Sequence, residues 1–184
     1  MNENNYGAGI YVAEGSNVTI TGTSVDDVLE ITGGSGCCGI GGYLSKGTWE
    51  SHSCGNITIE NITVRATSNR PRVTGYAAAI GSAGEKTVGS IKISNAVVYA
   101  RSGGYDAYGG AGIGGGVSDL SGIGQTEFDI SIADSEIHVS RGCPYASYIG
   151  AGGMRSEQTN YKIIPSAKIT NSIIYDESGI EIKQ

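Results

Sequence analysis

AGIGGG at Ala111–Gly116 decides the fold, because variants of this stretch return along the chain. The related runs are GAGI at Gly7–Ile10, CCGIGG at Cys37–Gly42, AAIGS at Ala78–Ser82 and IGAGG at Ile149–Gly153. Four of the runs are followed, after a loop of variable length, by a second phrase: ITIEN, IKISN, ISIAD or KITN. A unit this short cannot bury its apolar face alone, so neighbouring copies must stack. The repeat therefore predicts a solenoid in which each copy forms one turn.

One isoleucine in each run marks the same position of the repeat. The column is Ile10, Ile40, Ile80, Ile113 and Ile149, so the spacings are 30, 40, 33 and 36 residues. The positions two residues before and after it hold mostly small side chains, and residues two apart share one face of a strand. We expect the column to face inward. A strand so rich in glycine is weak by itself, and it needs pairing with the turns above and below.

Two further strands complete each unit. The second carries Val18/Ile20, Ile57/Ile59, Ile91/Ile93, Ile130/Ile132 and Ile169, and the third carries Val64/Ala66, Val98/Ala100, Ile137/Val139 and Ile174. We expect strands near 8–12, 17–21, 57–60, 62–66, 78–82, 91–94, 96–100, 111–115, 130–133, 136–139, 148–151, 167–170 and 172–175. Short β-branched strands that alternate in this way predict an all-β protein. The expected fold is a right-handed parallel β-helix of about five coils, forming one domain over residues 1–184.

A polar column stands between the second and third strands. Its members are Asn61, Asn95, Asp134 and Asn171, with Gly22 at the same place in the first unit. Asn and Asp tolerate the left-handed conformation that a sharp bend needs, and their side chains can bond a neighbouring backbone group. We expect these side chains to turn inward and form a buried ladder. A row of ligand-binding groups is the disfavoured alternative.

The charge and composition exclude several classes of protein. The chain has 12 Lys and Arg against 18 Asp and Glu, and it has no basic run. Nucleic acid and anionic membranes are therefore poor partners. No stretch of 18 apolar residues is present, so membrane insertion is not expected. The start MNENNYGAGI lacks the regions of a signal peptide, and the end GIEIKQ reads as an uncapped strand, so we expect a segment of a longer secreted chain.

Four cysteines are present, Cys37, Cys38, Cys54 and Cys143, and they lack metal-ligand spacing. An even number suits an oxidising compartment, but sequence does not determine disulfide pairing. The favoured interpretation is small buried thiols in tightly packed turns. No metal and no cofactor is expected.

The longer phrases resemble a known group of proteins. GAGIYVAEGSNVTITGTSVDDVLEITGGSG, followed by GIGG, CGNITI and YGGAGIGGG, is similar to the Gly-rich repeats of secreted and surface proteins of gut bacteria. Such proteins are often described as carbohydrate-binding or adhesin-like, and they belong to the right-handed β-helix, pectate-lyase-like superfamily. The resemblance covers nearly all of the chain. It implies an extracellular or cell-surface location and a role in binding carbohydrate or in adhesion.

The motifs of the catalytic members are largely missing. Hydrolases of that superfamily resemble an NTD, DD, GHG, RIK pattern with paired carboxylates, and this chain has only the DD at Asp26–Asp27. Lyases need a carboxylate cluster for calcium and a nearby base. Asp26, Asp27 and Glu30 read as a solvated edge, and His138 as an exposed strand position. A diverged polysaccharide lyase or glycoside hydrolase is therefore the second alternative to a non-catalytic role.

The loops that join the third strand to the next unit concentrate aromatic and basic side chains. We predict a ligand-binding set there: Tyr76, Tyr105, Tyr108, Tyr145, Arg72, Arg101 and Arg141. Aromatic faces stack on sugar rings, and guanidinium groups hold hydroxyls or carboxylates. The expected partner is a polysaccharide or a host or cell-surface glycan, with anionic sugars favoured by the arginines. The alternatives are that the tyrosines only cover the core edge and that the chain is a structural stalk or spacer.

Overall fold

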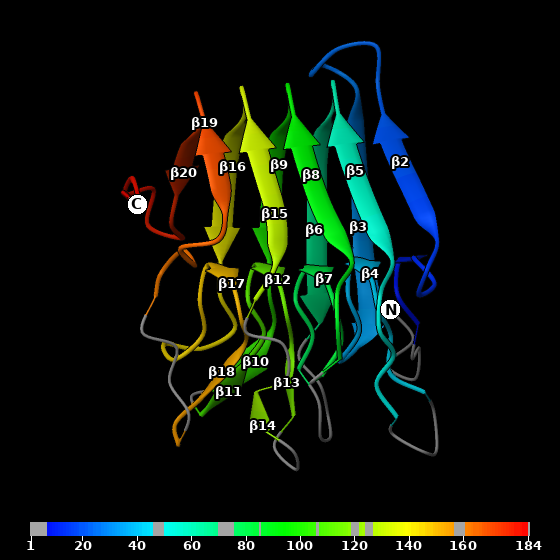
Figure 1. Cartoon of the computed structure of the whole chain (residues 1–184), viewed down its shortest axis with the longest axis vertical. Helices are drawn as coiled ribbons and strands as arrows, with labels where there is room; N and C mark the ends of the chain where they lie inside the picture. The colour runs from blue at the N-terminus through cyan, green and yellow to red at the C-terminus, as the bar shows by residue number, and fades with distance from the viewer. Residues whose placement is uncertain are drawn as a thin grey trace.

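The computed structural model describes residues 7–45, 50–69, 76–84, 86–105, 107–118, 122–123, 127–156 and 161–183. Within these residues the chain forms strands, turns and bends, with no helix. It winds into a parallel β-solenoid of about four turns (Figure 1). The predicted all-β solenoid is confirmed.

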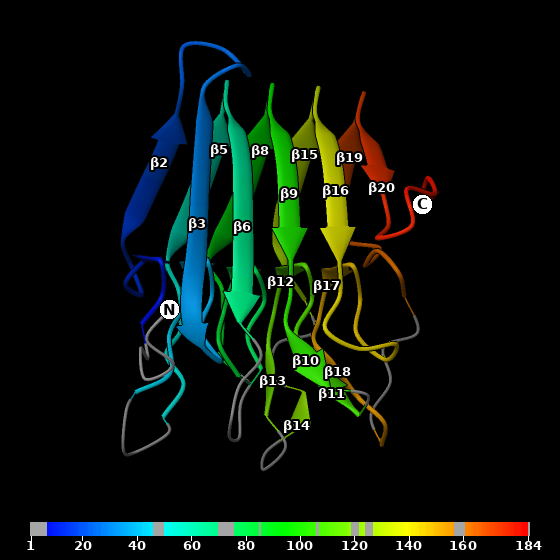
Figure 2. The same ribbon diagram turned by 180° about the vertical axis from the view of Figure 1, so that it is seen from behind.

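Three parallel sheets of five strands form the walls. Sheet A contains β1 (Ile10–Tyr11), β4 (Ile40–Gly41), β7 (Ile80–Gly81), β12 (Ile113–Gly114) and β17 (Ile149–Gly150). Sheet B contains β2 (Asn17–Thr21), β5 (Asn56–Glu60), β8 (Ser90–Ser94), β15 (Asp129–Ala133) and β19 (Lys168–Thr170). Sheet C contains β3 (Val28–Ser35), β6 (Thr63–Asn69), β9 (Val97–Arg101), β16 (Glu136–Ser140) and β20 (Ile173–Tyr175). Sheet B faces the viewer in Figure 1 and sheet C in Figure 2.

The isoleucine column of sheet A is confirmed. The parallel register pairs Ile10 with Ile40, Ile40 with Ile80, Ile80 with Ile113 and Ile113 with Ile149. All except Ile10, which lies in the first turn, are fully buried. Each of the other four isoleucines precedes a glycine with a positive φ of 126–137°, a region that residues with a side chain rarely occupy. The glycines therefore let the stacked backbones approach closely, and the strands of sheet A are only two residues long.

The first unit also contains a strand that the pattern did not predict. β3 pairs with β6, and this register places Leu29 beside Val64 and Ile31 beside Ala66. The two apolar residues thus continue the inward column of sheet C. The strands expected around the isoleucine column are four or five residues long, whereas those of sheet A end after two residues, and four of the five end at a glycine of positive φ.

The bends between sheets B and C are left-handed as expected, with φ of 54°, 48°, 49° and 46° at Asn61, Asn95, Asp134 and Asn171. The expectation that these four side chains are buried is wrong, because all four are exposed. The next residue fills the inside of the corner instead: Ile62, Ala96 and Ser135 are buried. A left-handed residue reverses the direction of the chain, so its own side chain points away from the core.

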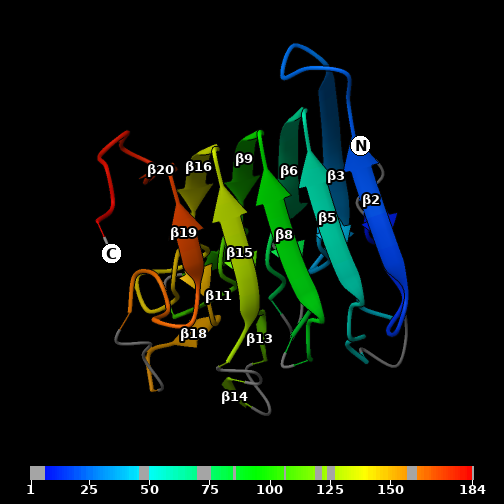
Figure 3. The same cartoon turned by 45° about the horizontal axis from the view of Figure 1, so that its top comes forward.

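A small layer of short antiparallel strands lies at the other end of the walls. It contains β10 (Gly104–Tyr105), β11 (Tyr108–Gly109) and β18 (Gly153–Met154) in one sheet, and β13 (Val117–Ser118) and β14 (Gly122–Ile123) in another. Figures 1 and 3 show these strands away from the B–C bends. The long loops that leave the regular solenoid thus gather at one end of the walls.

Candidate functional site

The outer face of sheet C carries a row of side chains that differ from turn to turn. The strand register aligns Glu30, Arg65, Tyr99, His138 and Tyr175, one from each of five neighbouring strands. They alternate along the strands with inward aliphatic residues such as Val98 and Ile137, which are fully buried. Because successive side chains of a strand point to opposite faces, burial of one set fixes the other set on the outside. We call Tyr99, His138 and Tyr175 the aromatic row.

The rings of the aromatic row stack on one another. The Tyr99 and His138 centroids are 4.5 Å apart with an interplanar angle of 7°, and those of His138 and Tyr175 are 5.1 Å apart at 23°. The Arg65 guanidinium carbon lies 4.2 Å from the Tyr99 centroid. Neighbouring strands are about 4.8 Å apart, so the strand spacing itself brings the rings into contact. The His138 ring is therefore covered on both faces, by Tyr99 and Tyr175, and the Tyr99 ring lies between His138 and the Arg65 guanidinium.

A groove of about 840 Å³ runs beside the aromatic row. We call it the outer groove. Its lining comes from four strands of sheet C and from the turn after β20: Glu30, Arg65, Thr67, Tyr99, Ala100, Arg101, Ser102, His138, Val139, Ser140, Arg141, Asp176, Glu177 and Gly179. Three guanidinium groups thus meet hydroxyl groups and the ring edges on one surface.

The arginines of the outer groove are held differently. Arg141 donates from Nη1 to the Ala146 carbonyl at 2.9 Å, and its guanidinium carbon lies 4.6 Å from the Tyr148 ring centroid. Arg101 is exposed, and within the described residues its guanidinium has no hydrogen-bond or ion-pair partner. Arg141 is therefore fixed in orientation, Arg65 lies over the Tyr99 ring, and Arg101 is available to a ligand.

The carboxylates stand at the ends of the groove. Asp176 and Glu177 lie at the end nearest the C-terminal strand, and Glu177 accepts a hydrogen bond of 3.3 Å from the Tyr148 hydroxyl. Burial raises the pKa of Tyr148, while the positive charge of Arg141 lowers it by a smaller amount. Tyr148 thus stays a neutral donor at ordinary pH. The groove is positive along its middle and negative at this end.

The predicted tyrosines gather outside the outer groove. The Tyr76 and Tyr108 rings stack at 5.6 Å, and Tyr105 meets Tyr76 edge-on at 6.0 Å. Tyr76 is only 6% exposed and packs with Val117 and Met154, whereas Tyr105 is 38% exposed. The rings of this group form a small core under the loops.

The remaining predicted residues are spread over the structure. Arg101 and Arg141 line the outer groove, whereas none of the four tyrosines is among its described lining residues. Tyr145 is half-buried in its loop, and Arg72 lies outside the described residues. The structure thus brings together two of the predicted arginines and three of the tyrosines, in two groups.

Sequence reasoning missed the aromatic row. Its signal lies in the third strands, because Arg65, Tyr99, His138 and Tyr175 each follow directly on an inward residue of the predicted column. The inward residues repeat from turn to turn, whereas the outward residues between them share no residue type that would mark a column. His138, expected to be merely exposed, is half-buried between two rings, and its Nε2 lies 2.6 Å from Glu136 Oε1.

Neither the acidic residues nor the cysteines form a metal site. Within the described part of the chain, no group of three or more His, Cys, Asp or Glu side chains is placed to hold a metal ion. Asp27 Oδ2 accepts hydrogen bonds from the Thr23 N–H and hydroxyl, and this carboxylate therefore closes the loop between β2 and β3. The same hydrogen bonds lower the pKa of Asp27. The four cysteines are buried with free thiols. Burial raises the pKa of Cys37 to about 11 and that of Cys54 to about 12.

Comparison with protein-family models, with curated proteins and with solved structures finds no match to this chain. Family membership therefore stays a prediction from the sequence. Across the described residues, no helix has the length and apolar character that crossing a membrane requires.

Proposed function

We propose that this chain is a non-catalytic, carbohydrate-binding or adhesive segment of an extracellular or cell-surface protein. It is a right-handed β-helix of the Gly-rich, pectate-lyase-like kind, and its outer groove binds an extended polysaccharide or a host or cell-surface glycan. The observation that carries this proposal is the outer groove itself, in which the unpaired Arg101 lies beside the oriented Arg141. Loops and faces held on a rigid scaffold are the usual place of binding residues.

The groove suits a polymer because it crosses several turns of the solenoid. Lining residues come from β3, β6, β9 and β16, and strands of neighbouring turns are about 4.8 Å apart. A chain of sugar residues laid along the axis would meet a different outward side chain at each turn. An extended ligand thus contacts several turns at once.

The three arginines favour an acidic polymer. A guanidinium pairs with a carboxylate through two parallel hydrogen bonds, and such charge-assisted bonds are stronger than neutral ones. The contribution of the rings differs from the one expected from sequence. Because the Tyr99 ring lies between His138 and the Arg65 guanidinium, it offers its edge and hydroxyl group to a ligand, and it does not offer an open platform for stacking.

The test compares two charge-removing variants of the same turn. Arg101→Gln removes a guanidinium from the outer groove, whereas Lys92→Gln removes an exposed charge from the outer face of sheet B. Binding to polygalacturonate is measured by calorimetry at low and at physiological salt. We expect Arg101→Gln to weaken binding about tenfold or more, because hydrogen bonds to charged groups contribute roughly 1.5–3 kcal/mol. Lys92→Gln should change it less than about twofold.

Two outcomes would overturn the proposal. One is a parent chain that binds no acidic polysaccharide, and the other is an Arg101→Gln variant that binds as well as the parent. Binding through exposed charges should weaken with salt, since screening acts over roughly 8–10 Å at these ionic strengths. Release of oligosaccharides during the same incubation would support the lyase or hydrolase alternative.

A structural stalk is the second candidate, and the stacked aromatic row favours it. Three rings and a guanidinium in continuous contact across four turns add cohesion between turns, whether or not a ligand is present. Absence of binding to any polysaccharide, together with high thermal stability, would support this function.

A further inference from the structure

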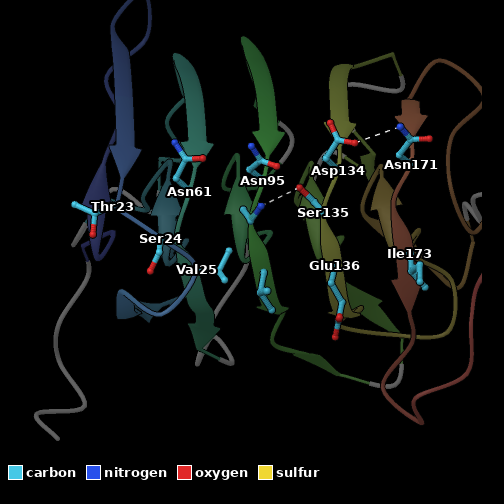
Figure 4. A pocket seen from close by; sticks show the side chains of 12 residues that line it. Thr23, Ser24, Val25, Asn61, Asn95, Asp134, Ser135, Glu136, Asn171 and Ile173 are labelled. Carbon is cyan, nitrogen blue, oxygen red and sulfur yellow. Dashed lines mark hydrogen bonds between the residues drawn. The ribbon is translucent and has the colours of Figure 1, made fainter.

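A second groove, of about 500 Å³, lies along the bends between sheets B and C (Figure 4). We call it the bend groove. One side is the row of exposed bend residues, and the other is formed by the first outward residues of sheet C, Val97, Glu136 and Ile173. The loop residues Thr23, Ser24 and Val25 close one end. The groove therefore crosses the turns in the same direction as the outer groove.

The left-handed φ accounts for the residue types of the bend row, since Asn and Asp tolerate it, but it leaves their side-chain amides and carboxylate exposed. Glycine takes a left-handed φ at the lowest cost, and the chain uses it at Gly15, Gly36, Gly84 and Gly179. Four of the five B–C connections instead carry a left-handed Asn or Asp, giving three amides and one carboxylate. A turn-forming Asn usually bonds a nearby backbone group, but within the described residues the Asn61 and Asn95 amides have no hydrogen-bond partner. Asn171 Nδ2 donates only to Asp134 Oδ1, at 3.3 Å.

The lining of the bend groove is neutral or weakly acidic. It contains no Lys or Arg among its described residues, in contrast to the outer groove. Its two carboxylates are Asp134, which accepts a hydrogen bond from Asn171, and Glu136, whose Oε1 lies 2.6 Å from His138 Nε2. Amide and hydroxyl groups can both donate and accept hydrogen bonds, while Val97 and Ile173 offer apolar surface. A polyanion is disfavoured here, and a ligand rich in uncharged hydroxyl groups is favoured.

We propose that the bend groove is a second binding site, for a neutral polysaccharide that extends along the solenoid axis. Each amide of the row serves as a paired donor and acceptor for the hydroxyl groups of one sugar residue, and the apolar side contacts its C–H groups. The row repeats at the strand spacing of about 4.8 Å, so a regular polymer meets an amide at three of the four turns and the Asp134 carboxylate at the other. This site is independent of the acidic-glycan site proposed above.

The bend groove and the outer groove lie on the same outer face of sheet C and run parallel to each other. Val97 and Tyr99 are two residues apart on the same side of β9, which places them about 7 Å apart along the strand. The aromatic row therefore separates the bend groove from the outer groove. Two polysaccharide chains of different charge can lie side by side on the outer face of sheet C.

The decisive variant is the double substitution Asn61→Gly, Asn95→Gly. Glycine keeps the left-handed φ without strain, so the variant removes two amides and leaves the fold unchanged, which the thermal midpoint verifies. Binding is measured by affinity electrophoresis in gels that contain mixed-linkage glucan, galactomannan or xyloglucan, with polygalacturonate as the acidic probe. We expect the affinity for the bound neutral polymer to fall about tenfold, because each neutral hydrogen bond contributes only a few-fold. Polygalacturonate binding should not change.

Arg101→Gln is the matched control, because it alters only the outer groove. It should leave neutral binding within about twofold of the parent, and neutral binding should be insensitive to salt. The proposal is overturned if the parent binds none of the three neutral polymers, or if the folded double-glycine variant binds them as the parent does. Equal losses of neutral binding in both variants would also overturn it, because one shared site would then explain the data. Failure of the acidic probe alone contradicts the proposed function and leaves this site intact.

Discussion

The inner and outer faces of sheet C carry opposite kinds of side chain, although they alternate along the same strands. Inside, Val64, Val98, Ile137 and Ile174 form a uniform aliphatic column. Outside, one residue further along, the side chains of the same four strands are a guanidinium, a phenol, an imidazole and a second phenol. Each inward residue must fill the space between two turns, so its size and polarity are constrained. The outward residues are not constrained by packing in this way. The outer face of the sheet is therefore the place where a repeat protein can vary its side-chain chemistry.

The largest expected effect tests the inner face directly. Ile137→Ala should lower the free energy of unfolding by about 2–5 kcal/mol, because Ile137 is fully buried and the lost methyl groups leave a cavity. His138→Ala, one residue away on the outer face, is the matched control and should cost about 1 kcal/mol or less. Urea denaturation of both variants gives the two values. Equal costs would show that the faces are not distinguished by packing.

A second prediction concerns pH and the buried thiols. The pKa values of Cys37 and Cys54 rise from 9.0 to about 11 and about 12 on burial. Between about pH 9 and 12 the unfolded chain therefore loses protons that the folded chain keeps. The free energy of unfolding should be unaffected by these thiols below pH 9. It should fall above that value by up to about 1.4 kcal/mol per pH unit for each cysteine.

The control for this pH dependence is the double variant Cys37→Ala, Cys54→Ala, because tyrosine and lysine side chains also titrate in this range. Urea denaturation at several pH values should give a shallower slope for the variant than for the parent. Identical slopes would mean that the thiols are accessible to water in the folded chain.

A third prediction concerns the bends, where the exposed side chains should contribute little to stability. Asn95→Gly should leave the thermal midpoint unchanged or raise it, whereas Asn95→Ala should cost about 1 kcal/mol because alanine is strained at the left-handed φ of 48°. Differential scanning calorimetry of the two variants measures this difference. A large loss in the glycine variant would indicate that the amide supports the fold.

The smallest effect should come from coupling within the aromatic row. A double-mutant cycle with Tyr99→Ala and His138→Ala should give an interaction free energy of about 0.5–1 kcal/mol, since the two rings stack across neighbouring strands. A second cycle with Tyr99→Ala and Lys92→Ala is the control. Lys92 lies on the outer face of sheet B, so this pair should show no coupling. No coupling in the first pair would contradict the stacked geometry.

Sequence predicted the parts of the fold that the turns impose on one another. The isoleucine column and the left-handed bends followed from repetition, because a position that recurs in every unit must satisfy the same packing or backbone demand. The burial of the Asn row was predicted wrongly, since strict alternation does not continue through a left-handed residue and Ile62 and Ala96 occupy the inside of the corner. The strand β3 was missed because Gly22 replaces the Asn or Asp of the bend in its unit and a longer connection, 22–27, separates it from β2.

The candidate site was predicted only in part, and the reason is its variety. Arg101 and Arg141 stood out as arginines concentrated in loops. Tyr99 and His138 did not stand out, because they are different residue types 39 positions apart in the sequence. They come into contact only through the pairing of β9 with β16. A pattern search finds what repeats, whereas this row is made of residues that differ from one turn to the next.

The strand register also determines how such a molecule can grow. Copying one whole turn would lengthen the aromatic row and both grooves by the same step, without disturbing any existing wall. Each added turn would bring further contacts to a polymer that is already held, so its residence time would rise through valency while recognition at each turn stayed the same. The number of turns would thus determine the avidity for a polymer. The outward residue of each turn would separately determine which polymer is bound.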